Sequence, residues 1–190
     1  MTHPPLLGRA WIWLLALLAN VACSASVPTA SKVPNLYQVK PGLWRSGQPT
    51  TAEQWVELRR MGISRVIKLN FESEASDDGA RAAGLIVHEV SIQPAGDTDV
   101  FDALANTFTR PDPVRLAEAQ TILRLDWVRG GVLVHCTHGQ DRTGFVIGQM
   151  RVLTDRWSKS RAYAEMRHYG FHPLLRGLRE AWEDWRPPTP

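Results

Sequence analysis

The chain has 190 residues, of which 44% are hydrophobic, and a formal net charge of +3. This length and composition suit one domain with a full hydrophobic core and leave little room for a second. The mild positive charge suits anionic substrates. Because the sequence includes no dense run of Lys and Arg, the charge gives little support for nucleic-acid binding.

The first 25 residues are predicted to form a secretory signal peptide. Arg9 ends a short polar start, an apolar run follows from Ala10 to Ala22, and small residues come next. That order is typical of export signals, and the run is shorter than the ~20 residues that a membrane-spanning helix needs. We predict cleavage after Ala25 and a periplasmic or secreted location. The alternative is lipidation of Cys23, which would anchor the protein to a membrane.

The cysteine count bears on the chemistry of the chain. Its only cysteines are Cys23 and Cys136, so cleavage after Ala25 would leave Cys136 alone. An exported protein with one cysteine cannot use it for an internal disulfide. Cys136 is therefore either a small buried hydrophobic residue or a reactive thiol.

The first half of the chain reads as a linker followed by alternating strands and helices. Residues 26–35 are rich in Ser, Pro, Thr and Lys and are interpreted as the linker, with one folded domain over residues 36–186. The predicted elements are strands at Tyr37–Val39 and Leu43–Ser46, a helix from the Thr50/Glu53 capping box to about Gly62, a strand at Arg65–Asn70, a short helix at Asp77–Ala83 and a strand at Ile86–Ile92.

The second half continues the alternation after a long polar loop. Residues 93–112 form that loop, and connections of this length are often functional. The elements predicted after it are a helix capped by Asp112 and Pro113 that runs to Val128, a strand at Val132–His135, and helices at Arg142–Leu153, Ser160–Tyr169 and Leu174–Trp185, the last capped by His172–Pro173. Alternating strands and helices predict an α/β fold with a mainly parallel sheet.

One segment, VLVHCTHGQDRTGFVIG at residues 132–148, combines a strand, a tight loop and a helix. Gly139 permits backbone angles that other residues resist, so the loop can turn its N–H groups inward. A helix that begins near Arg142 adds the positive end of its dipole. The segment therefore predicts an anion-binding loop, for which phosphate is the natural ligand.

The residue types in this loop suit phosphoryl transfer. A helix N-terminus and a nearby cation favour the thiolate form of cysteine, so Cys136 is predicted to be the nucleophile. The guanidinium of Arg142 can hold two phosphate oxygens in a fork. Thr143 can donate a hydrogen bond to the departing thiolate. The residues predicted to contact the phosphate of the substrate are Thr137, His138, Gly139 and Gln140, although a solvent-facing His138 is an equally good interpretation.

The leaving oxygen also needs a proton, so a carboxylic acid must stand opposite the thiol. We predict that this acid is Asp141, which lies within the loop beside Arg142. Asp97, in the polar loop of residues 93–112, is the alternative. If Asp97 is the acid, Asp141 would be structural and would hold Arg142 or a backbone N–H in place.

These residues resemble the dual-specificity branch of the cysteine-based protein tyrosine phosphatases. The branch shares His-Cys, five residues, Arg and then Ser or Thr, matched here by His135, Cys136, Arg142 and Thr143. The segments GLWRSGQPT and AYAEMRHYGFHP are similar to parts of its atypical bacterial, plant and fungal members. Over residues 37–180 the resemblance implies a central sheet with helices on both sides, a phosphocysteine intermediate, and no metal or other cofactor.

The resemblance implies a phosphorylated protein as substrate but leaves other substrates open. Asp141 before the Arg is similar to the GxDRT loop of phosphoinositide phosphatases, although the bacterial ones carry Lys where this chain has Gln140. A phosphorylated lipid or an inositol polyphosphate is therefore the alternative substrate. The run HCTHGQDRTGF also resembles the RNA 5′-triphosphatase domain of mRNA-capping enzymes, which does not suit an exported protein. A non-catalytic phosphate-binding module is disfavoured because Cys136 and Arg142 are both present.

Overall fold

The computed structural model describes residues 33–93, 104 and 106–188. The predicted signal peptide, Cys23, Asp97 and most of the predicted linker lie outside these residues. Within the described part of the chain, no helix combines the length and hydropathy needed to cross a membrane.

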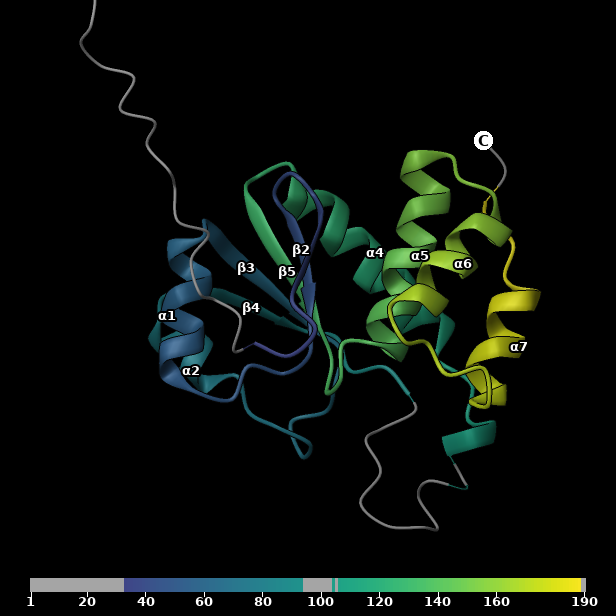
Figure 1. Ribbon diagram of the computed structural model, residues 1–190, viewed down its shortest axis with the longest axis horizontal. Helices are drawn as coiled ribbons and strands as arrows, with labels where there is room; N and C mark the ends of the chain where they lie inside the picture. Colours follow the sequence, from purple (N-terminus) through teal and green to yellow (C-terminus); the bar gives the residue numbers. More distant parts are fainter. Residues whose placement is uncertain (1–32, 94–103, 105, 189–190) are drawn as a thin grey trace, which may run out of the picture.

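A five-stranded sheet forms the centre of the domain, with the strand order β1-β2-β5-β3-β4 (Figure 1). Only β1 and β2 pair in antiparallel fashion, and the other neighbours are parallel. The prediction of a mainly parallel sheet is therefore confirmed. The strands are β1 (Tyr37–Lys40), β2 (Leu43–Ser46), β3 (Ile63–Lys68), β4 (Ile86–Glu89) and β5 (Gly131–His135).

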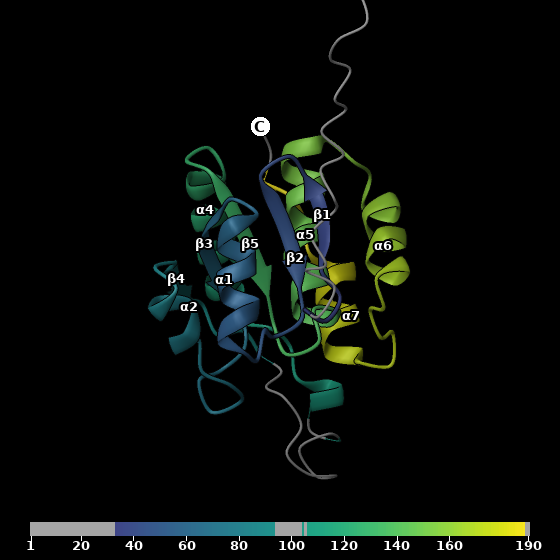
Figure 2. The same cartoon turned by 60° about the vertical axis from the view of Figure 1, so that its left-hand side comes forward.

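Helices cover both faces of the sheet, as expected (Figures 1 and 2). The helices α1 and α2 lie on one face, and the helices α4 to α7 lie on the other. Residues 104 and 106–108 are also helical. The bounds are α1 (Ala52–Arg60), α2 (Asp78–Ala82), α4 (Pro113–Trp127), α5 (Asp141–Asp155), α6 (Lys159–His168) and α7 (Arg176–Asp184).

The central strand β5 is buried on both faces and joins two hydrophobic cores. Val132 and Val134 pack into the larger core with α4 to α7, whereas Leu133 packs into the smaller core under α1 and α2. Successive strand residues point to opposite faces, so a strand covered on both sides needs a continuous apolar run. The sequence VLV at residues 132–134 meets that need. Because β5 is the middle strand, the loop that follows it lies at the middle of the sheet's carboxyl edge.

Helix α1 begins one residue later than predicted. Its capping box uses Thr51 and Gln54 instead of Thr50 and Glu53. The Thr51 hydroxyl accepts from the Gln54 backbone N–H at 3.3 Å, and the Gln54 side chain accepts from the Thr51 N–H at 3.2 Å. Both pairs have the same three-residue spacing, so spacing alone does not separate them.

The capping prediction for the last helix is wrong. Helix α7 begins at Arg176, and its N-cap residue Leu175 makes no side-chain capping bond. His172, which was predicted to take part in the cap, instead bonds to Asp141 at the start of α5. A contact across 31 residues leaves no local signature in the sequence.

The packed part of the domain includes residues assigned to the linker from sequence. Val33 is 5% exposed and belongs to the smaller core. The carbonyl of Pro34 accepts a hydrogen bond from the backbone N–H of Gly47 at 2.7 Å. Pro34 therefore contacts the segment that follows β2, and Val33 packs in the smaller core.

Candidate active site

The segment of residues 136–142, called the Cys136 loop below, follows the carboxyl end of β5. The parallel neighbours β2 and β3 end at the same edge of the sheet. In open α/β sheets this edge is where ligands bind. The loop runs directly into α5, which begins at Asp141, so the N-terminus of a 15-residue helix faces the same space.

Hydrogen bonds from outside the loop fix the direction of its peptide groups. In a planar trans peptide, the carbonyl of one residue and the N–H of the next point in opposite directions. Since three successive carbonyls are bound by outer donors, the N–H groups of residues 138–140 point to the opposite side. These N–H groups thus face the interior of the loop. The three bonds are Gln48 N–H to Thr137 O (3.0 Å), Asn35 Nδ2 to His138 O (2.8 Å) and Arg45 Nη2 to Gly139 O (2.7 Å).

Gly139 lets the loop lie against the end of β2. Its φ is +71°, a conformation that disfavours residues with a Cβ atom. A Cβ here would lie 2.3 Å from the carbonyl carbon of Ser46 and 2.4 Å from the Gly47 nitrogen. No side chain fits at this position without moving the backbone of β2.

The two residues predicted to carry the chemistry lie at the ends of this loop and are both buried. Cys136 is a free thiol and is 2% exposed. Arg142 is 6% exposed and sits in the first turn of α5. The chain thus places a thiol and a guanidinium around one set of inward-facing N–H groups.

A carboxylate that sequence reasoning missed holds Arg142. The two terminal nitrogens of Arg142 donate to the two carboxylate oxygens of Glu74, each over 2.7 Å. The hydroxyl of Thr137 also donates to Glu74, over 2.5 Å, and accepts from Arg142 at 3.0 Å. A guanidinium has five N–H donors, and these contacts use three of them, which leaves two for a ligand.

The charges in this pair reinforce each other. Burial raises the pKa of Glu74, but the hydrogen bonds and charge of Arg142, together with Thr137 and the Phe71 N–H, lower it overall to about 2. Burial lowers the pKa of Arg142, whereas the Glu74 hydrogen bond and the charges of Cys136 and Glu74 raise it overall. Both groups are therefore ionised at neutral pH.

A second carboxylate from the same segment binds the residue before the nucleophile. Asp77 Oδ2 lies 2.8 Å from His135 Nε2, and both side chains are fully buried. Burial raises the pKa of Asp77, but hydrogen bonds from His135 and Gln48 outweigh this effect and lower it. An ionised carboxylate only accepts hydrogen bonds, so Nε2 of His135 carries the proton.

Residues 71–77 therefore bind at both ends of the Cys136 loop: Glu74 binds Arg142, the last loop residue, and Asp77 binds His135, the residue before Cys136. The segment follows β3, which is the neighbour of β5 in the sheet. The sequence held one signal for this: acidic residues after a strand predicted to be parallel to the strand before Cys136. The sequence did not show which strands are neighbours or which acids face the loop.

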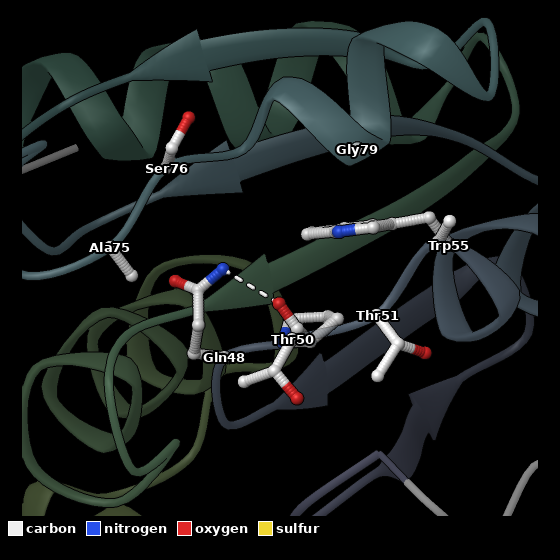
Figure 3. Close-up of a pocket in the computed structure, with 9 residues that line it drawn as sticks. Gln48, Thr50, Thr51, Trp55, Ala75, Ser76 and Gly79 are labelled. Carbon is white, nitrogen blue, oxygen red and sulfur yellow. Dashed lines mark hydrogen bonds between the residues drawn. The ribbon is translucent and has the colours of Figure 1, made fainter.

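A pocket of about 260 Å³ adjoins the segment of residues 71–77, with Ala75 and Ser76 in its lining. Figure 3 shows Trp55 reaching across it from α1 towards Gly79, and the amide of Gln48 on another side. Gln48 links the pocket to the site, because its side chain donates to Asp77 at 2.8 Å while its backbone N–H donates to the Thr137 carbonyl. The rings of Trp55 and His135 pack in a T-shaped arrangement, with 5.9 Å between their centroids. The pocket walls thus support the residues that hold the loop.

Asp141, the predicted general acid, is engaged with the C-terminal segment. One carboxylate oxygen accepts from the backbone N–H of His172 at 2.7 Å, and the other lies 3.0 Å from the His172 ring Nδ1. The carboxylate is mostly buried, and the His172 ring is largely exposed. These contacts are of the kind that the structural interpretation of Asp141 expects.

The remaining predicted residues differ in their surroundings. Thr143 is fully buried, and its hydroxyl has no hydrogen-bond partner among the described residues. His138 is exposed. The Gln140 side chain packs next to Gly170, where an added Cβ would meet it at 2.8 Å. Asp97 lies outside the described residues. Within those residues, no group of three or more His, Cys, Asp or Glu side chains is arranged to hold a metal ion.

Comparison with known proteins gives relatives that match about 70% of this chain. The chain is 31% identical over 137 residues to the dual specificity protein phosphatase TpbA of Pseudomonas aeruginosa, which is 72% of this chain and 55% of TpbA. It is 28% identical over 136 residues to the inositol diphosphatase DSP1 of Oryza sativa subsp. japonica, 71% of this chain and 56% of that protein. The chain thus spans little more than half the length of the curated relatives that it matches.

Solved structures agree with the fold. The crystal structure of P. aeruginosa TpbA has a TM-score of 0.60 and 26% sequence identity, and covers 80% of this chain and 86% of that chain. The core catalytic domain of the PP-IP phosphatase SIW14 from S. cerevisiae has a TM-score of 0.58 and 21% identity, and covers 79% and 86%. At that identity the second likeness concerns the fold alone. Residues 32–176 match the tyrosine phosphatase family. The match covers most of the chain, including the whole Cys136 loop, and the protein therefore belongs to the tyrosine phosphatase family.

Proposed function

We propose that the protein hydrolyses phosphomonoesters through a phosphocysteine intermediate, as a protein tyrosine or dual-specificity phosphatase. One observation carries this proposal. Three carbonyls of the Cys136 loop are bound from outside, so N–H groups face inward between the buried thiol of Cys136 and the guanidinium of Arg142. Such an arrangement suits a tetrahedral anion placed against a nucleophile.

In the first step the thiolate of Cys136 attacks phosphorus. The S–P bond forms as the P–O bond to the leaving group breaks, and the leaving oxygen takes a proton from a carboxylic acid. The two remaining N–H donors of Arg142 bind phosphate oxygens, and the inward N–H groups of residues 138–140 bind the others. These fixed donors stabilise the charge that develops on the transferring group.

In the second step water attacks the phosphocysteine. Its proton passes to the carboxylate that acted first as acid, the S–P bond breaks, and inorganic phosphate and the thiolate are released. The buried hydroxyl of Thr143 has no partner among the described residues, so it is available to donate to the thiolate as it departs.

For the proton donor we propose Asp97 over Asp141. The supporting observation is that both oxygens of Asp141 already contact His172, one through the backbone N–H and the other at the ring Nδ1. A donor to the leaving group must release and regain a proton in each cycle, which a carboxylate tied into the C-terminal segment does poorly. In this proposal Asp141 joins the start of α5 to residues 171–173.

The relatives suggest two substrate classes. The relative TpbA is named a dual specificity protein phosphatase, and a structure of it has been solved in complex with phosphotyrosine. This supports a phosphorylated protein as the substrate of this chain. DSP1 is named an inositol diphosphatase and SIW14 a PP-IP phosphatase, so inositol pyrophosphates and other phosphorylated inositols are the second candidate.

The test is a substrate panel on the purified protein, with an aryl phosphate, a phosphotyrosine peptide, a phosphoserine peptide, a phosphoinositide and an inositol pyrophosphate. We expect hydrolysis of the aryl phosphate and the phosphotyrosine peptide, and a covalent phosphate on Cys136 after rapid quenching. The Cys136→Ser variant should lose turnover while it still binds vanadate. Turnover near the wild-type rate in that variant would refute the mechanism.

A further inference from the structure

We propose that Arg45 is a positioning residue for this reaction, a buried cation beneath the Cys136 loop that fixes the Gly139 carbonyl and favours the thiolate of Cys136. This inference rests on the proposed function, because it assigns to Arg45 a part in preparing the nucleophile. Arg45 is 1% exposed, so substrate does not reach it and it acts only through the loop.

The hydrogen bond from Arg45 to the loop is short and buried. Nη2 of Arg45 donates to the Gly139 carbonyl over 2.7 Å. Because the Gly139 carbonyl is bound by Arg45 from outside the loop, the N–H of Gln140 in the same peptide points to the interior of the loop. The bond thus sets the direction of one of the donors that would hold the phosphate.

The site of Arg45 is an unusual place for a cation. Its Nε has no hydrogen-bond partner among the described residues, and one face of the guanidinium lies 4.5 Å from the centroid of the Tyr169 ring. Burying a charge without full compensation is costly, and a cation–π contact offsets only part of that cost. Stability of the fold alone therefore gives little reason for a charge here, and a role in the neighbouring site gives one.

The charges that face Arg45 identify that neighbour. Burial lowers the pKa of Arg45, and the largest opposing influence is the thiolate of Cys136, ahead of Glu165 on α6, Tyr169 and Tyr37. Electrostatic attraction is mutual, so the cation favours the thiolate as much as the thiolate favours the cation.

The thiol also faces other charged groups, which a test must keep constant. The charge of Cys136 raises the pKa of Arg142 on α5, and the ion pair with Glu74 offsets part of the Arg142 charge. His135 precedes Cys136 and is bound by Asp77. Arg45 comes from β2, on another side of the loop, so a substitution there leaves these four groups in place.

The experiment measures the reactivity of Cys136 without any turnover. The rate of alkylation by iodoacetamide is followed against pH in wild type, Arg45→Lys and two neutral variants, Arg45→Gln and Arg45→Met. Lys and Gln can both donate to the Gly139 carbonyl and differ in charge. We expect the midpoint of the profile to rise by about one pH unit in Gln and Met and to stay near wild type in Lys. Two neutral variants are made so that either one carries the comparison if the other does not fold.

Arg65→Met is the matched control, because Arg65 is a mostly buried arginine on β3 that is bound to Asp126 and not to a group facing Arg45. It should lower the melting temperature without moving the alkylation profile. Midpoints equal to wild type in folded Gln or Met variants would overturn the proposal. Failure of the proposed function would look different. The wild-type protein would then hydrolyse no phosphate ester, but the midpoint of the alkylation profile would still shift in the neutral Arg45 variants.

Discussion

The carboxylate of Glu74 binds both terminal nitrogens of Arg142, each over 2.7 Å, and both side chains are 7% exposed. A guanidinium on a flexible side chain has many orientations, and a two-point contact leaves one of them. Glu74 thus orients Arg142 before any substrate arrives. Binding then does not have to order this side chain, which is a general way to strengthen interactions in the transition state.

Glu74→Gln should therefore lower turnover. The amide can accept only one of the two hydrogen bonds and carries no charge, so Arg142 loses its fixed orientation. We expect kcat with an aryl phosphate to fall at least about tenfold. Glu118→Gln is the control, because Glu118 is an exposed residue on α4 paired with Arg115. If kcat is unchanged in Glu74→Gln, the pair contributes to folding only.

The same pair predicts an acid-dependent loss of stability. The pKa of Glu74 is lowered from 4.5 to about 2 in the folded protein, so unfolding at low pH is accompanied by proton uptake. The stabilisation is fully present above pH 4.5 and is lost as the pH falls from 4.5 towards 2. We expect the ionised Glu74 carboxylate to contribute about 2 kcal/mol to the free energy of unfolding at neutral pH, after allowance for screening by nearby water.

Denaturant unfolding of wild type and Glu74→Gln at several pH values between 7 and 3 tests this expectation. The difference in unfolding free energy between the two proteins should shrink as the pH falls below 4.5. A difference that stays constant over this range would show that the Glu74 carboxylate has its ordinary pKa in the folded state.

Arg142→Lys should reduce turnover by about a hundredfold and weaken phosphate binding. An ammonium group is a point charge without the planar fork, so it cannot hold Glu74 and two phosphate oxygens at once. Arg151→Lys is the control for the general effect of replacing a buried arginine. Steady-state kinetics and vanadate inhibition measure both variants. Unchanged kinetics in Arg142→Lys would assign Arg142 a purely structural role.

Export is the prediction that concerns residues outside the described part of the chain. We expect the protein, expressed in a bacterial host, to appear in the periplasm or medium with an N-terminus near residue 26. Mass spectrometry of the intact product decides this. A diacylglycerol-modified Cys23 would establish the membrane-anchored alternative, and an intact Met1 in the cytosol would refute both.

The parts of this molecule that could be predicted from sequence are those set by neighbouring residues. The apolar run of β5, the glycine at 139 and the start of α5 lie within one short segment, so their order alone predicts a strand, an anion-binding loop and a helix. The mainly parallel sheet followed from the alternation of such segments.

The parts that could not be predicted reach the loop from far along the chain. Arg45 contacts Gly139 across 94 residues, Glu74 contacts Arg142 across 68, and Asp77 contacts His135 across 58. Several acids follow β3, and no local pattern separates the two that face the loop from those that face solvent. Which acid turns inward depends on the packing of β3 beside β5, which one sequence does not reveal.

The proton donor is the last question for experiment. If Asp97 donates the proton, Asp97→Asn should lose far more rate with a poor leaving group, such as an alkyl phosphate, than with a good one, such as p-nitrophenyl phosphate. The reason is that a good leaving group departs as an anion and needs little help from an acid. The basic limb of the kcat/KM profile should also flatten in that variant, because this limb reports the loss of the acid's proton.

Asp141→Asn should instead slow both substrates equally and lower the melting temperature, since it weakens the contact between α5 and His172. His172→Ala is the matched variant: it keeps Asp141 and its bond from the His172 backbone N–H and removes only the two ring contacts at 3.0 and 3.3 Å, so it should show a weaker form of the same uniform effect. A selective loss with the poor leaving group in Asp141→Asn, but not in Asp97→Asn, would return the role of general acid to Asp141.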